Sequence, residues 1–119
     1  MDMWKLSGRL MFLTGIIHTI VGVILGYSAI NEISHREYFN VIAQNINLEY
    51  HFWFIFCGLI IIMLGQLLHV FIQKTQEPAP KFLGYSIMTI SIIGCILIPA
   101  SGFWLFIPQA LIILFPAKN

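Results

Sequence analysis

The sequence carries very little charge. Six lysines and arginines and five aspartates and glutamates make up 9% of its 119 residues, whereas 59% of the residues are hydrophobic. A typical soluble domain has about 25% charged residues. So few charges cannot cover the surface of a soluble domain of this length. The formal net charge of +1 also gives no support for nucleic-acid binding, which requires a basic surface.

Cysteine is scarce as well. The two cysteines, Cys57 and Cys95, both lie in apolar runs and form neither a CxxC pair nor a zinc-type spacing. We expect no metal site and two buried thiols, although similar depths keep a disulfide geometrically open. No nucleophile is placed beside a base, so the sequence predicts no catalytic residues. Enzymatic activity stays undecided, and a non-enzymatic role is the favoured interpretation.

Long uncharged runs occupy most of the chain. A membrane-spanning helix needs about 20 mainly apolar residues, and Pro99 and Gly102 indicate a turn that divides the last run in two. The sequence therefore predicts an all-α integral membrane four-helix bundle, made of two helical hairpins, as a single domain over residues 1–119. The expected spans are 10–30, 50–73, 82–98 and 103–115.

Positive charge falls on one side of these spans. Five of the six basic residues belong to one set of connections, and Arg36 alone belongs to the other. The excess of lysine and arginine marks the cytoplasmic side of a membrane protein. The sequence thus predicts that both termini are cytoplasmic. The five residues are Lys5, Arg9, Lys74, Lys81 and Lys118.

The first outer connection, residues 31–49, is polar but keeps apolar residues at roughly helical intervals. This pattern predicts a short amphipathic segment on the membrane surface. Aromatic residues at the ends of the spans fit the two membrane interfaces. Phe52–Trp53 and Phe103–Trp104 are expected at the outer interface, and Trp4 at the inner one.

Each of the first three predicted helices carries one stripe of small residues. At about 100° per residue, the glycines of the first span share a face with His18, and those of the second share a face with His69. Small residues let membrane helices approach closely. We expect these stripes to be packing faces, within the chain or in a homo-oligomer, while the other faces contact membrane lipids. The glycines are Gly8, Gly15, Gly22, Gly26, Gly58 and Gly65.

Four polar side chains lie deep in the predicted spans. From the rise of 1.5 Å per residue, His18 lies about 12 Å, Gln66 about 9 Å and His69 about 4.5 Å from the inner interface. Gln109 lies near the middle of the last span. Polar groups at such depth are costly and usually face the bundle interior. We expect His18, Gln66 and Gln109 to converge, either as hydrogen bonds that hold the helices together or as a ligand site with His69 nearby.

Five short motifs are distributed along the chain: WKLSG at 4–8, TGIIHT at 14–19, HFWF at 51–54, GxxxH at 65–69 and SGFWLxxPQA at 101–110. They resemble a family of small bacterial four-span membrane proteins that is catalogued only as a domain of unknown function. More distantly, the architecture is similar to DoxX-like membrane proteins, some of which are linked to quinone or thiol redox systems. The resemblance covers nearly the whole chain and implies a multi-pass protein of the bacterial plasma membrane, but no catalytic residues.

The favoured function is binding of a small apolar or amphipathic molecule, such as a quinone or a lipid fragment, beside His18, Gln66 and Gln109. A histidine or glutamine in such a pocket can hydrogen-bond a carbonyl or hydroxyl head group. A second hypothesis is a haem electron-transfer protein with His18 and His69 as axial ligands. A third is a structural or accessory subunit without a ligand.

Overall fold

The computed structural model describes residues 2–36, 39–43 and 45–117, and the described chain is helical without any strand. This confirms the predicted all-α class. Two short 3-10 helices, η1 and η2, accompany five α-helices. The elements are η1 (Met3–Leu6), α1 (Ser7–Leu25), α2 (Tyr27–Ser34), α3 (Ile46–Thr75), α4 (Lys81–Leu97), η2 (Gly102–Leu105) and α5 (Phe106–Leu114).

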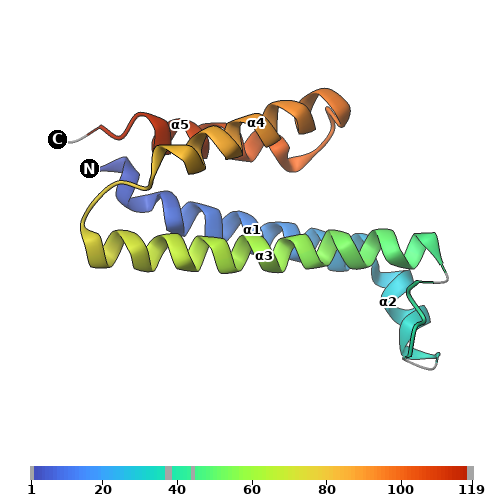
Figure 1. Cartoon of the computed structure of the whole chain (residues 1–119). Coiled ribbons are helices and arrows are strands. Elements are labelled where there is room, and N and C mark those ends of the chain that lie inside the picture. Colours follow the sequence, from blue (N-terminus) through green and yellow to red (C-terminus); the bar gives the residue numbers. More distant parts are fainter. Residues whose placement is uncertain (1, 37–38, 44, 118–119) are drawn as a thin grey trace.

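The helices form two hairpins of unequal length. The long helices α1 and α3 lie side by side and antiparallel, whereas α4 and α5 fold back on each other beside the end that holds the N-terminus (Figure 1). The shorter hairpin meets the longer one through contacts of α5 with α1 and η1. Both chain ends therefore lie at the same end of the molecule (Figure 1).

Only the first hairpin has helices of the usual length of a membrane span, about 20 residues or more. The helical segments Met3–Leu25 and Ile46–Thr75 are long and apolar enough to span a membrane, with mean hydropathies of 1.8 and 2.5. Helix α4 has 17 residues, which gives about 25 Å, less than the hydrocarbon thickness of about 30 Å. The structure therefore shows two candidate spans, and it does not show the four spans that the sequence predicts.

Glycines set the spacing between α1 and α3. A Cβ atom added to Gly15 would lie 2.6 Å from the Ile62 nitrogen, and one added to Gly22 would lie 2.9 Å from the Phe54 ring. Gly58 in turn faces Thr19 of α1. Because these glycines touch the facing helix, the expected packing stripes are packing faces within the chain. Glycine every seventh residue, at 8, 15 and 22, matches the repeat of a left-handed helix pair.

The predicted first span ends earlier than expected. Helix α1 stops at Leu25, and the chain turns at Gly26 into α2, which points away from the long hairpin (Figure 1). The His51 ring packs directly against Gly26. A Cβ atom added to Gly26 would lie 3.2 Å from His51 Nδ1, so a glycine fits this turn and a larger residue would crowd the ring. The amphipathic segment thus begins at Tyr27, four residues before the expected start.

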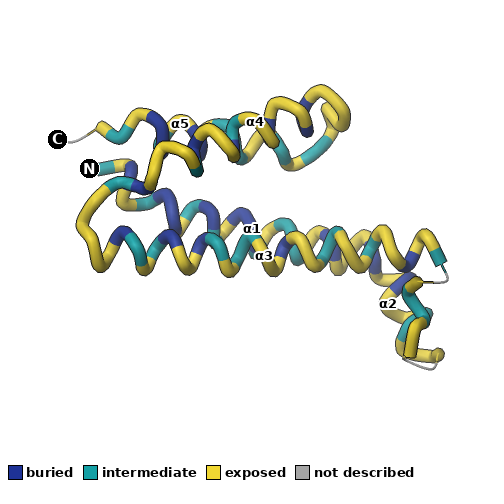
Figure 2. The backbone as a smooth tube through the Cα atoms, viewed as in Figure 1, coloured by how far each residue is buried: buried dark blue, intermediate teal, exposed yellow. Residues whose placement is uncertain are grey.

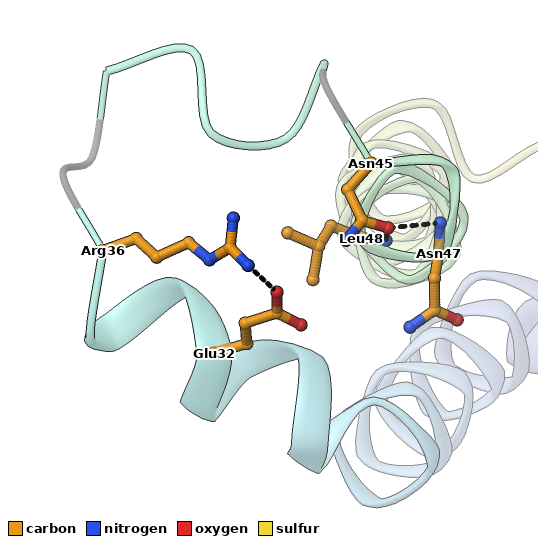
Figure 3. Close-up of polar contacts among 5 residues, drawn as sticks. All are labelled: Glu32, Arg36, Asn45, Asn47 and Leu48. Atoms are coloured by element: carbon orange, nitrogen blue, oxygen red, sulfur yellow. Dashed lines mark hydrogen bonds and ion pairs between the residues drawn. The ribbon is translucent and has the colours of Figure 1, made fainter.

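Polar contacts lie at both ends of the connection between α2 and α3 (Figure 3). Arg36 forms an ion pair with Glu32 one turn earlier on α2. Asn45 caps α3, because its Oδ1 accepts hydrogen bonds from the backbone nitrogens of Asn47 at 3.0 Å and Leu48 at 3.4 Å. This cap explains why α3 starts at Ile46, four residues before the predicted span.

The Asn45 cap can be tested by substitution. Asn45→Ala should lower the free energy of unfolding by about 1 kcal/mol, because two backbone N–H groups lose their acceptor. Thermal unfolding in detergent, followed by far-ultraviolet circular dichroism, measures this change. Asn45→Asp should keep the stability, because aspartate accepts the same hydrogen bonds, and an equally large loss for Asp would contradict the capping role.

Pro108 changes the start of the last helix. The structure has a 3-10 helix, Gly102–Leu105, that passes into α5 at Phe106. Pro108 thereby becomes the third residue of α5, where its missing N–H is not required for an intrahelical bond. The Trp104 indole donates a hydrogen bond of 2.8 Å to the Pro99 carbonyl and closes the turn between the helices.

The buried core lies where the two hairpins meet. Buried residues gather on the facing sides of α1, α3 and α5 near the chain ends, whereas the far half of the long hairpin is mostly exposed (Figure 2). Trp4, predicted at the inner interface, is 4% exposed and belongs to this core. The core consists of Trp4, Met11, Leu68, Ile72, Ala79, Ile87, Ala110 and Ile113.

Candidate functional site

The four side chains proposed as a site occupy different environments. Gln109 is buried, His18 and His69 are partly buried, and Gln66 is exposed on α3. Within the described chain, no hydrogen bond joins any two of them, and each bond that Gln109 and His18 form goes to another residue. No direct hydrogen bonds therefore join His18, Gln66 and Gln109, and Gln66 lies on the exposed side of α3.

Gln109 connects the second hairpin to the first. Its Nε2 donates to the Thr14 hydroxyl of α1 at 2.6 Å and to the Leu105 carbonyl at 3.0 Å. The Thr14 hydroxyl donates its own hydrogen bond to the Leu10 carbonyl at 2.9 Å, so its oxygen can accept the hydrogen bond from Gln109. The sequence did not single out Thr14 as a site residue, although it lies one turn before His18 in the TGIIHT motif at 14–19.

His18 joins α1 to α3. Its Nε2 donates to the Phe54 carbonyl at 3.0 Å, and its ring stacks on the Phe54 ring with 4.2 Å between centroids and 13° between planes. Gly58 leaves room for the imidazole, because an added Cβ would lie 3.1 Å from His18 Cδ2. The contacts given for His18 are thus made within the first hairpin and hold its two helices together.

The separation of the two histidines does not suit a haem with two axial histidines. His18 of α1 contacts Gly58 of α3. His69 lies on α3, eleven residues after Gly58, and contacts Gly8 of α1. Eleven residues correspond to about 16 Å along the helix axis. Two nitrogen ligands of one metal ion lie about 4 Å apart, twice the usual metal–nitrogen distance. His18 and His69 therefore do not face one iron in this fold.

Three buried polar atoms lack a hydrogen-bond partner among the described residues: Gln109 Oε1, His69 Nδ1 and Trp4 Nε1. They come from α5, α3 and η1, and η1 contacts both of the other elements. The junction of the two hairpins therefore holds one acceptor, one donor and an imidazole nitrogen that no described residue satisfies. Buried polar groups of this kind usually bind ordered water or a ligand.

A groove lies at the other end of the molecule, away from these atoms. It has a volume of about 200 Å³ between α2 and α3, and its lining is apolar except for His51. Cys57 is exposed and Cys95 buried, and both are free thiols. The described residues contain no group of three or more histidine, cysteine, aspartate or glutamate side chains that could hold a metal ion.

Comparison with known proteins gives one result. Residues 2–119 match a family of unknown function, DUF6463. No curated protein and no solved structure matches the chain. The match confirms that the chain belongs to a family of unknown function, whereas nothing in it links the chain to membrane proteins or to DoxX-like proteins.

Proposed function

Because the chain belongs to the family of unknown function DUF6463, a function has to be argued from its own residues, and we propose that it is a membrane-embedded ligand-binding protein. It crosses the bacterial plasma membrane four times with both termini inside. At the junction of its hairpins it binds a small amphipathic molecule, quinone-like or lipid-like, beside Gln109 and His69.

The surface of the molecule supports the membrane placement. Large apolar side chains are exposed along both long helices, for example Ile24 at 68%, Met63 at 70% and Leu67 at 67%. Such a surface is stable in lipid and unstable in water. Lys5, Arg9, Lys74 and Lys81 all lie at the end that holds the chain termini, so the orientation follows from the positive-inside rule.

The unsatisfied atoms at the junction are the observation that carries the ligand proposal. Gln109 Oε1 needs a donor and Trp4 Nε1 needs an acceptor, while His69 Nδ1 takes either role with its tautomer. A molecule with a hydroxyl and a carbonyl group on an apolar body satisfies such a set. Gln109 is positioned for this role because Thr14 already occupies its Nε2. His18 and Gln66 take no part in the revised site.

The ligand proposal is tested by quenching of tryptophan fluorescence with a short-chain benzoquinone. In a Trp53→Phe, Trp104→Phe background, the remaining Trp4 reports on the junction. Quenching should saturate, and Gln109→Leu should raise the Kd about tenfold, as the loss of one buried hydrogen bond implies. Gln73→Leu, the same change at an exposed position, should leave the Kd unchanged. Unsaturable quenching in the parent protein would contradict the proposal.

A structural role without a ligand is the second candidate. The His18–Phe54 hydrogen bond and the glycine contacts between α1 and α3 favour it, because they use polar and small residues to fasten helices together. In that case ordered water satisfies the three junction atoms. Linear, unsaturable quenching by the quinone, together with full stability of the parent protein, is the result expected from this alternative.

A further inference from the structure

Gln66 lies on the exposed side of α3, and within the described chain no hydrogen bond reaches its carboxamide. In the predicted span 50–73, Gln66 lies about 9 Å from the inner interface. A glutamine side chain is too short to reach the membrane surface from there. In the proposed membrane placement, its amide would therefore remain unsatisfied in hydrocarbon, which is costly.

Gln66 belongs to a regular seam on the outer face of α3. The residues at 56, 59, 63, 66 and 70 alternate by three and four positions, which is the heptad spacing of helices that pair in a left-handed coiled coil. All five are exposed, with Met63 at 70%, Leu59 at 46% and Val70 at 45%. The seam lies on a different face of α3 from Gly58 and Gly65, which contact α1. Its first two residues, Phe56 and Leu59, also line the groove beside α2.

We propose that α3 pairs along this seam with α3 of a second copy, and that the two Gln66 carboxamides hydrogen-bond to each other. A carboxamide carries donors and an acceptor, so an identical group is its complement. Copies inserted with the same orientation place residue 66 at the same depth, and a two-fold axis along the membrane normal makes their α3 helices parallel. A single polar residue in an apolar heptad seam sets the register of such a pair.

The glycine faces do not compete with this interface. The sequence left open whether the glycine stripes pack within the chain or in a homo-oligomer. In the structure, the stripes of α1 and α3 contact each other within one chain. The seam of α3 is therefore the surface that a second copy reaches. This inference rests on the proposed membrane placement and is independent of the proposed ligand, since Gln109 and Gln66 lie on different helices.

Oxidative crosslinking in membranes tests the seam. In a background with Cys57→Ala and Cys95→Ala, Met63→Cys should form a disulfide-linked dimer. Ile90→Cys on α4 is the matched control, because Ile90 is 60% exposed and Met63 70%, yet Ile90 lies outside the seam. No crosslink at residue 63, or equal crosslinking at residues 63 and 90, would overturn the proposal.

The role of Gln66 is tested by resonance energy transfer between labelled copies in lipid vesicles of phosphatidylethanolamine and phosphatidylglycerol. Gln66→Leu should weaken dimerisation by about 3-fold to 20-fold, the range of interhelical hydrogen bonds in membranes. Gln66→Asn, which keeps the carboxamide, should retain most of the affinity. A parent protein that inserts but stays monomeric, or a Gln66→Leu variant that pairs as tightly, would refute the pairing. Failure to insert would instead refute the membrane placement.

Discussion

Gly15→Leu is expected to lower the free energy of unfolding by about 3 kcal/mol, at the upper end of the usual cost of overpacking. Gly15 lies in the contact between α1 and α3, where an added Cβ would lie 2.6 Å from the Ile62 nitrogen and 3.1 Å from the Ile61 carbonyl carbon. These are backbone atoms of a helix, so they cannot rotate away. The two helices must separate instead, and the contacts of neighbouring glycines are lost with them.

Thermal unfolding in detergent, compared with the parent protein, measures this effect. Gly102→Leu is the matched control, because nothing lies within 4 Å of a Cβ added to Gly102. That variant should unfold within a few degrees of the parent protein. Equal losses at the two positions would show that the α1–α3 contact does not depend on glycine.

In intact cells, a membrane-impermeant maleimide should label a single cysteine at the start of α3 and should not label one just after its end. In a background with Cys57→Ala and Cys95→Ala, Asn47→Cys should react in intact cells, whereas Glu77→Cys should react only after permeabilisation. Both residues are exposed and lie at opposite ends of a helix of 30 residues. Such a helix is about 45 Å long and exceeds the hydrocarbon thickness of about 30 Å.

The same experiment decides how the short hairpin is placed. Ala100 lies exposed at its tip, and four complete spans predict that Ala100→Cys reacts from outside. A hairpin that enters and leaves on the cytoplasmic side would keep Ala100→Cys unreactive in intact cells. Reaction of Glu77→Cys from outside, with Asn47→Cys protected, would reverse the proposed orientation.

Local features of the sequence were sufficient to predict the helical class and the packing faces. Residues 50–73 contain no aspartate, glutamate, lysine or arginine and are mostly apolar. When such a segment lies in lipid, its backbone hydrogen-bonding groups are satisfied only in a helix. Gly15, Gly22 and Gly58 were predicted to be packing positions, since the spacing of small residues around a helix is a property of one segment. Their contacts with the facing helix bear this out.

Helix ends were predicted less well, because they depend on single side chains. Uncharged residues continue through residue 30, yet α1 stops at Leu25, since Gly26 packs against His51 from a distant segment. Asn45 was counted among loop residues, although an asparagine before an apolar run is a common helix cap. That signal was available in the sequence.

The partners of the polar residues were decided by the tertiary structure alone. Depth in the membrane can be counted along one helix, and by this measure His18, Gln66 and Gln109 were equivalent. Their actual surroundings depend on how each helix is rotated and on which helix it meets. In helices that are apolar on every side, the hydrophobic pattern does not specify that rotation. Contacts between distant segments therefore pair Gln109 with Thr14 and His18 with Phe54, and leave Gln66 on the outer face of α3.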